Sequence, residues 1–265
     1  MKLQPFHMID KKRDGEKILM LTAFDFITSK VLNEVGVDII LVGDSLGNVF
    51  SGFENTLPVT IDHIIYHTQA VSRANSDSLL VADMPFLSYQ VSIQQAKANA
   101  GRLLKEGGAQ AVKIEINNSE LDYVKNIVDM GIPVMAHVGF TPQSVYQLGG
   151  YKVQGRENSE SEALLERAKQ LEAIGCFAIV LEMVPNNLAK KITDSVSIPT
   201  IGIGAGKSCD GQVLVTQDLL NMTGNKTPRF VKHYGNMYED MKRSLNQFKD
   251  DVKKGQFPED QHTFD

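Results

Sequence analysis

The chain is poor in several residue types that mark particular classes of protein. Its 265 residues include no tryptophan and only two cysteines, Cys176 and Cys209, which cannot by themselves build a disulfide framework or a zinc site. No run approaches the roughly 20 apolar residues of a membrane span, and residues 1–14 contain no apolar signal region. We therefore expect a soluble protein of a reducing, cytoplasmic compartment.

An excess of positive charge is also missing. The 27 basic and 32 acidic residues give a net charge of −5, which argues against a nucleic-acid or anionic-membrane partner. Repeats, low-complexity tracts and linkers are likewise not apparent, although 42% of the residues are hydrophobic and can form a large core. The sequence predicts a single domain over residues 1–265, with a short N-terminal extension and a C-terminal helix.

Apolar segments that are typical of buried strands alternate along the chain with helical segments. The predicted strands are residues 18–24, 37–42, 79–85, 111–115, 133–139, 177–183, 198–203 and 212–215. The predicted helices are residues 25–34, a segment starting at 60, 92–106, 119–130, 160–174, 188–195 and 238–252.

This alternation predicts a parallel sheet. Eight strands in about 250 residues favour a closed (β/α)8 barrel over the alternative, an open doubly wound sheet. No G-x-G-x-x-G motif follows the first strand, which disfavours a dinucleotide-binding fold. The seventh and eighth strands are too close for a full helix between them. Residues 47–58 and 140–156 are long irregular segments that we expect to act as lids.

Charged residues gather where the predicted strands end. Asp44 follows the strand at 37–42, and by itself would be a turn residue or a helix cap. The pattern recurs with Asp83, Lys113, Glu115, His137 and Glu182. In α/β folds the carboxyl ends of the strands form the ligand site. Converging carboxylates need a cation to stay ionised together, and the oxygen ligands of Asp44, Asp83 and Glu115 suit Mg²⁺ better than zinc.

Each of these residues also has an ordinary structural explanation. Asp83 could cap a turn, Lys113 and Glu115 could pair with each other, His137 could be a hydrogen-bonded core histidine, and Glu182 could cap the next helix. Several such coincidences at one rim are less common than one, so an active site is favoured. The residues alone predict a Mg²⁺-dependent enzyme that acts on a small anion through a carboxylate base.

Longer motifs carry a more specific resemblance. They are residues 41–47 (LVGDSLG), 56–60 (TLPVT), 66–68 (YHT), 82–86 (ADMPF), 112–115 (VKIE), 139–145 (GFTPQSV), 149–156 (GGYKVQGR), 181–185 (LEMVP) and 202–206 (GIGAG). With them the chain resembles the ketopantoate hydroxymethyltransferase family from about residue 16 onward. The resemblance implies a (β/α)8 barrel of the phosphoenolpyruvate mutase/isocitrate lyase-like type, a Mg²⁺ ion and a homodecamer.

It also implies an activity. A hydroxymethyl group passes from the co-substrate 5,10-methylenetetrahydrofolate to 3-methyl-2-oxobutanoate, which gives 2-dehydropantoate (ketopantoate) in pantothenate biosynthesis. Matched by position, the metal ligands are Asp44, Asp83 and Glu115, the substrate contacts are Asp44, Ser45, Asp83 and Lys113, and the general base is Glu182. We add His137 to the substrate-binding residues, since with Lys113 it can stabilise a developing oxyanion.

Two positions depart from the family pattern, and two other functions remain open. Ile116 replaces a usual glycine beside Glu115, and Phe24 replaces a common tyrosine. One alternative function is a Mg²⁺-dependent lyase of the same barrel superfamily that cleaves a C–C bond in 2-oxo or hydroxy acids. Such lyases usually carry a catalytic cysteine in a mobile loop, and neither long loop here contains one. The other is a non-catalytic barrel, which the presence of Glu182 disfavours.

Overall fold

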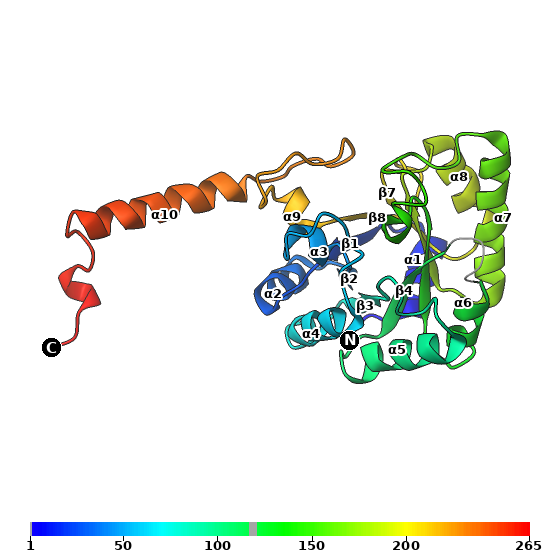
Figure 1. Ribbon diagram of the computed structural model, residues 1–265, viewed down its shortest axis with the longest axis horizontal. Helices are drawn as coiled ribbons and strands as arrows, with labels where there is room; N and C mark the ends of the chain where they lie inside the picture. The colour runs from blue at the N-terminus through cyan, green and yellow to red at the C-terminus, as the bar shows by residue number, and fades with distance from the viewer. Residues whose placement is uncertain (1, 117–120) are drawn as a thin grey trace. The chain divides into compact units, whose positions relative to one another are not determined.

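The computed structural model describes residues 2–116 and 121–265, and its centre is a closed barrel (Figure 1). Eight parallel strands pair in chain order, and β8 pairs with β1 to close the barrel. The strands are β1 (Ile18–Thr22), β2 (Ile39–Val42), β3 (Leu79–Asp83), β4 (Ala111–Glu115), β5 (Val134–Gly139), β6 (Ala178–Glu182), β7 (Thr200–Ile203) and β8 (Gly211–Leu214). The predicted (β/α)8 barrel is confirmed, and the open doubly wound sheet is wrong.

The helices connect the strands and lie around the outside of the barrel (Figure 1). They are α2 (Phe26–Val35), α3 (Leu46–Val49), α4 (Ile61–Ser72), α5 (Ile93–Lys105), α6 (Leu121–Val128), α7 (Asn158–Ile174) and α8 (Asn186–Ser195). As predicted, α2 begins after the capping side chain of Asp25 and ends at Gly36, whose φ is 81°. The predicted start of α6 at Ser119 lies outside the described residues. As expected, β7 and β8 are joined without a helix.

Helix α1 (Pro5–Arg13) lies on a stretch where the sequence predicts only a polar lead-in. Contacts with distant parts of the chain stabilise it. Met8 is fully buried, and Nζ of Lys12 donates to the carbonyls of Thr193 and Ile198 at 2.9 and 3.1 Å. Lys12 also forms a 3.0 Å ion pair with Asp210. Because these partners lie almost 200 residues further along the chain, local sequence patterns do not reveal the helix.

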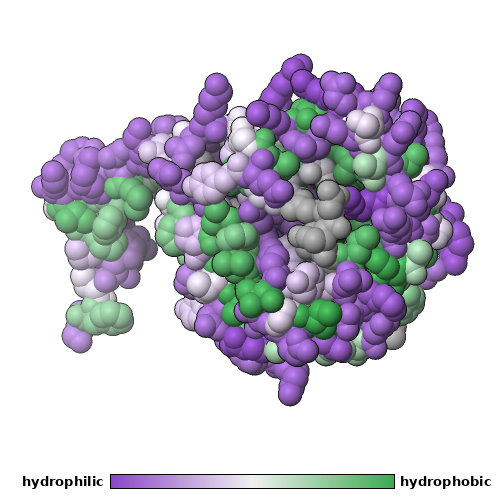
Figure 2. All heavy atoms as spheres, turned by 45° about the vertical axis from the view of Figure 1, so that its right-hand side comes forward, coloured by the Kyte–Doolittle hydropathy of each residue, from purple (hydrophilic) through white to green (hydrophobic). Residues whose placement is uncertain are grey.

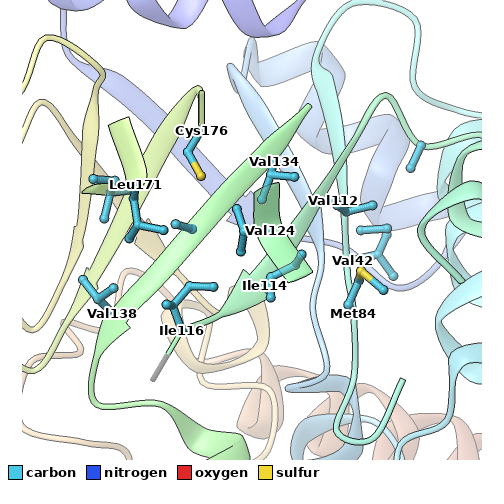
Figure 3. Packing of buried hydrophobic residues seen from close by; sticks show 14 of the residues in the cluster. Val42, Met84, Val112, Ile114, Ile116, Val124, Val134, Val138, Leu171 and Cys176 are labelled. Carbon is cyan, nitrogen blue, oxygen red and sulfur yellow. The ribbon is translucent and has the colours of Figure 1, made fainter. Parts of the chain in front are cut away.

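Side chains alternate between the two faces of each strand, and this alternation makes two cores. On β4, Val112, Ile114 and the following Ile116 pack outward, in one cluster with Val124 of α6 and Leu171 of α7 (Figure 3). Ala111 belongs instead to a second cluster inside the barrel, together with Met20, Ile39, Val81 and Met135. Ile116 therefore points away from the barrel interior, so its replacement of glycine does not place a side chain among the acids.

The chain divides into two compact units, one ending at Val215 and the other spanning Thr216–Asp265. The second contains α9 (Thr216–Leu219), α10 (Met237–Lys253) and the 3-10 turn η2 (Asp260–His262). Helix α10 carries a polar and an apolar face (Figure 2). Its apolar side chains are exposed at Tyr238, Met241, Leu245, Phe248 and Val252. The assignment of residues 1–265 to one domain stays a prediction. Within the described part of the chain, no helix combines the length and apolarity needed to cross a membrane.

Candidate active site

Strand register brings the charged residues together at the carboxyl ends of the strands. Asp83 of β3 lies opposite Lys113 of β4, and Glu115 of β4 lies opposite His137 of β5. Glu182, at the end of β6, lies opposite Gly139. On their strands, the charged residues lie on the same inward-facing side as the residues of the cluster inside the barrel. They surround a pocket of about 110 Å³ that is lined by Asp44, Ser45, Asp83, Lys113, Glu115, His137, Glu182, Thr22 and apolar neighbours. All the residues predicted for the site are thus brought together.

Asp83 holds two of its neighbours in place. Its Oδ1 forms a 2.7 Å ion pair with Nζ of Lys113, and its Oδ2 accepts the backbone N–H of Asp44 at 3.0 Å. Lys113 thus forms its ion pair with Asp83. In the ordinary structural explanation of the sequence, Lys113 would pair with Glu115 instead. Burial opposes the charge of Lys113, but attraction from the acids Asp83, Glu115 and Asp44 outweighs burial and raises its pKa. Lys113 is therefore a fixed cation in the pocket.

The remaining carboxyl groups are hard to ionise. Burial, followed by repulsion from Asp83, raises the pKa of Asp44 to about 7. Burial and the charge of Asp44 raise the pKa of Glu115 well above its usual value. Burial raises the pKa of Glu182 to about 8, although Lys113 acts to lower it. One lysine does not offset this many acids, so a further cation would stabilise the ionised cluster.

The donor set fits a hard cation, but it does not form a complete metal shell. Among the described residues, no three His, Cys, Asp or Glu side chains are arranged to hold one ion. Oε2 of Glu115 accepts the backbone N–H of Gln143 at 2.9 Å, whereas its buried Oε1 has no hydrogen-bond partner among those residues. Mg²⁺ commonly binds one or two carboxylates and completes its shell with water and substrate. Such an ion suits Asp44, Asp83 and the unpartnered oxygen of Glu115.

His137 lies between Lys113 and Glu182. Its Nδ1 is 3.2 Å from Nζ of Lys113, and its Nε2 is 3.1 Å from Oε2 of Glu182. Burial, and then the charge of Lys113, lowers the pKa of His137 well below its usual value, so the ring is neutral. An ammonium group can only donate, so Nδ1 accepts and the ring hydrogen is on Nε2. Nε2 lies close to Glu182, but the contact does not have the geometry of a hydrogen bond.

The backbone around Glu182 is tightly fixed. Its carbonyl accepts the N–H of Phe140 at 2.8 Å, and the next residue, Met183, has a left-handed φ of 48°. A Cβ atom on Gly139, whose φ is 97°, would overlap that same carbonyl oxygen. Only glycine fits this close approach. Helix α8 begins after Pro185, which occupies its N-cap position, so Glu182 is not the helix cap of the structural alternative.

Sequence reasoning missed three polar residues: Thr22, which lines the pocket, and Gln143 and Tyr89, which lie beside its acids. Nε2 of Gln143 donates to Oδ2 of Asp44 at 2.8 Å, and the Tyr89 hydroxyl lies 3.0 Å from Oε1 of Gln143. Gln143 belongs to the 3-10 turn η1 (Pro142–Ser144) at the start of the predicted lid at 140–156. Its only signal in the sequence is its place in the GFTPQSV motif, and Tyr89 has none.

A closed parallel barrel with acids, a lysine and a histidine at the carboxyl ends of its strands is typical of (β/α)8-barrel enzymes. Many solved structures share the fold, and two of them illustrate it. One is phosphonopyruvate hydrolase in complex with oxalate and Mg²⁺, with a TM-score of 0.62, 10% identity, and coverage of 96% of this chain and 88% of that one. The other is 2,3-dimethylmalate lyase, a phosphoenolpyruvate mutase/isocitrate lyase superfamily member, with a TM-score of 0.59, 13% identity, and coverage of 96% and 99%. At identities this low, the two structures show the fold alone, and this shared fold is the predicted type of barrel.

The sequence comparisons define the particular family. The chain belongs to the ketopantoate hydroxymethyltransferase family, whose model matches residues 2–260. It is 54% identical over 253 residues to the 3-methyl-2-oxobutanoate hydroxymethyltransferase of Geobacter metallireducens, covering 96% of this chain and 95% of the relative. The enzyme of the same name from Clostridium acetobutylicum is 53% identical over 255 residues, covering 96% and 92%. The predicted family is confirmed.

Proposed function

We propose that this chain transfers a hydroxymethyl group from 5,10-methylenetetrahydrofolate to 3-methyl-2-oxobutanoate, which forms 2-dehydropantoate for pantothenate biosynthesis. The observation that carries the proposal is the 54% identity, over nearly the full chain, to a relative named for this activity. The pocket of about 110 Å³ is of a size for a small acid, and it contains a buried cation, Lys113, to attract one.

Glu182 is the proposed general base. It removes the proton from C3 of the 2-oxo acid, and the resulting carbanion-like C3 then forms a bond to the methylene carbon of the folate. Both C–N bonds of that methylene break, one water supplies the hydroxyl oxygen, and tetrahydrofolate leaves. A pKa of about 8, raised by burial, lies close to neutral pH, where a positioned base is most effective. Lys113 and the Nε2–H of His137 supply positive charge and a hydrogen-bond donor for the negative charge that develops on the keto oxygen.

Asp44, Asp83 and Glu115 are the proposed Mg²⁺ ligands, and Oε1 of Glu115 has no hydrogen-bond partner among the described residues, so it could bind the ion directly or through water. Bound Mg²⁺ would act as a Lewis acid toward the keto oxygen of the substrate. Asp44, Ser45, Asp83, Lys113 and His137, which all line the pocket, would contact the substrate.

The two predicted lids would exclude water from the reacting carbon. They contact each other in the structure, since Nδ2 of Asn55 donates to the hydroxyl of Tyr146 at 3.1 Å. Excluding water protects a basic carbon intermediate from reprotonation before the folate carbon reacts.

The alternative, a C–C lyase, lacks its usual catalytic cysteine. Cys176 and Cys209 are buried and lie outside both lids, and burial raises the pKa of each thiol. A thiol whose pKa is raised is a poor nucleophile at neutral pH.

A direct assay tests the proposed activity. Purified protein is incubated with 3-methyl-2-oxobutanoate, 5,10-methylenetetrahydrofolate and Mg²⁺, and ketopantoate is measured by mass spectrometry, with Glu182→Gln as the inactive control. Wild-type protein that is folded but forms no ketopantoate would overturn the proposal. Folate-independent cleavage of 2-oxo or hydroxy acids would instead support the lyase.

We also propose that the chain forms a homodecamer in the cytoplasm. Helix α2 exposes Ile27, Val31 and Val35, which are one turn apart, and α10 exposes its own apolar face. Each of the two units thus has an exposed apolar surface that contact with other subunits could bury. Both cysteines are free thiols, in keeping with a reducing compartment. Sedimentation analysis giving the mass of a monomer would contradict the decamer.

A further inference from the structure

Gln143 makes an unusual set of contacts for a residue outside the predicted site. Its backbone N–H donates to Oε2 of Glu115 at 2.9 Å. Its side-chain Nε2 donates to Oδ2 of Asp44 at 2.8 Å and to the carbonyl of Met84 at 3.0 Å. Its Oε1 lies 3.0 Å from the hydroxyl of Tyr89. Gln143 is only 5% exposed, so its amide faces protein groups: Nε2 has two acceptors, and Oε1 shares the single hydroxyl hydrogen of Tyr89 with the carbonyl of Glu115.

The orientation of this amide is fixed by its surroundings. Both atoms that face Nε2 are acceptors, the carboxylate oxygen of Asp44 and the carbonyl oxygen of Met84. The group that faces Oε1 is the hydroxyl of Tyr89, which also lies 3.0 Å from the carbonyl oxygen of Glu115. Rotating the amide by half a turn would place Oε1 against two acceptors, which is unfavourable. Tyr89 is itself buried, so the pair is held in one arrangement.

Gln143 thereby holds one oxygen of each of two acids that come from different strands. Asp44 follows β2 and Glu115 ends β4, and no hydrogen bond joins the two directly among the described residues. With Oε2 of Glu115 bonded to Gln143, its Oε1 is left without a hydrogen-bond partner there, and it lies 3.8 Å from Nδ1 of His137. The two carboxylates would otherwise repel each other and turn apart.

We propose that Gln143 is a positioning residue that presents Asp44 and Glu115 to the cation and the 2-oxo acid, and that Tyr89 sets the orientation of its amide. This inference rests on the proposed function, because the acids that it orients are the proposed Mg²⁺ site. Groups that orient metal-binding side chains by hydrogen bonds typically change metal affinity by about 10- to 100-fold when removed.

The chain offers a matched control at the other end of the barrel. Gln110, next to the start of β4, also uses its amide in two backbone hydrogen bonds, to the carbonyl of Leu3 at 2.8 Å and from the N–H of Leu80 at 3.1 Å. Gln110→Met and Gln143→Met each remove a bridging amide while keeping a side chain of similar length. The first should lower the melting temperature alone, and the second should also weaken metal binding.

The test measures Mn²⁺ affinity by calorimetry on the full-length protein without substrate, so it does not depend on turnover. We expect Gln143→Met to weaken Mn²⁺ binding by about 10- to 100-fold. Tyr89→Phe, which removes a single hydroxyl and keeps the ring, should weaken it by about 3- to 10-fold, and Gln110→Met should leave it unchanged. In steady-state assays the loss should appear in the KM for the metal and the 2-oxo acid more than in kcat.

Several results would overturn the proposal. One is an Mn²⁺ affinity in Gln143→Met that equals that of the wild type. Another is an equal loss of affinity in Gln143→Met and Gln110→Met, because the loss would then follow from reduced stability. If Gln143→Met does not fold, unchanged affinity in Tyr89→Phe overturns it instead. Wild-type protein that binds no metal overturns it as well. A wild-type protein that binds Mn²⁺ tightly but makes no ketopantoate would count against the proposed reaction alone, and the positioning role would still be decided by the variants.

Discussion

Nε2 of His137 lies 3.1 Å from Oε2 of Glu182. The ring is neutral and its Nδ1 faces the ammonium group of Lys113, so its single N–H is on Nε2, which lies beside the carboxylate without forming a hydrogen bond to it. The proposed base is thus next to a neutral donor, and the full charge of Lys113 is one residue further away. This arrangement leaves Glu182 able to accept a proton, because a direct ion pair with the lysine would lower its pKa far more.

Replacing Glu182 by glutamine should separate catalysis from binding. The amide fills the same space but cannot accept a proton. Binding of Mg²⁺ and 3-methyl-2-oxobutanoate should survive, while turnover falls by about 10²–10⁴, or roughly 3–5 kcal/mol of barrier. Deuterium exchange at C3 in D₂O isolates the step, since it needs no folate. Exchange at the wild-type rate in Glu182→Gln would move the base elsewhere, and His137 would be tested next.

Replacing Asp83 by asparagine should weaken the binding of Mg²⁺ and of the 2-oxo acid together. Asp83 pairs with Lys113 and accepts the N–H of Asp44, so the change disturbs both the cation site and the lysine. We expect a loss of about tenfold or more in each affinity, about 1.4 kcal/mol or more, measured by calorimetry.

Asp210→Asn is the control for this change, because Asp210 forms its ion pair with Lys12 of α1, outside the site. It should reduce stability without altering either affinity. Binding of the 2-oxo acid that is insensitive to EDTA in the wild type would argue against a shared metal and substrate site.

Removing the buried charge of Glu182 should change how stability depends on pH. The pKa of Glu182 in the folded protein, about 8, is above its usual value of 4.5. The folded state therefore binds the proton of Glu182 more tightly than the unfolded state does. The stabilisation that this proton gives the folded state is complete below about pH 4.5 and is lost as the pH rises through about 8. Relative to wild type, metal-free Glu182→Gln should gain up to about 5 kcal/mol in its free energy of unfolding across this window, since each pKa unit corresponds to about 1.4 kcal/mol. Urea unfolding in EDTA measures it, and a pH-independent difference would exclude the shift.

Adding a methyl group at Gly139 should disturb both folding and the base. A Cβ there would overlap the carbonyl oxygen of Glu182, so Gly139→Ala should cost more than about 3 kcal/mol of stability and displace the base. Gly131→Ala is the matched control, because its φ is also positive, at 83°, and nothing lies within 4 Å of the new atom. It should cost only the backbone strain, about 1–2 kcal/mol. Equal losses in thermal unfolding for the two variants would mean that the overlap is relieved.

The sequence by itself determined the order and position of the strands and the members of the predicted site. Apolar, β-branched segments mark the strands because a parallel sheet in a barrel is buried on both faces. Asp25 and Gly36 mark the ends of α2 because capping depends on residues a few positions apart. Long motifs with the acids at strand ends identified the family, and all the residues predicted for the site line one pocket.

Only the tertiary structure decided which of these residues contact each other. Two partners were possible for Lys113, and β3–β4 register selected Asp83, which lies opposite it, over Glu115 on its own strand. Gln143 reaches Asp44 from 99 positions away in the sequence, and α1 is held by residues almost 200 positions away. Such contacts exist only after the barrel closes and fixes the register of neighbouring strands. Local propensity carries no information about them, because it acts over a few residues at a time.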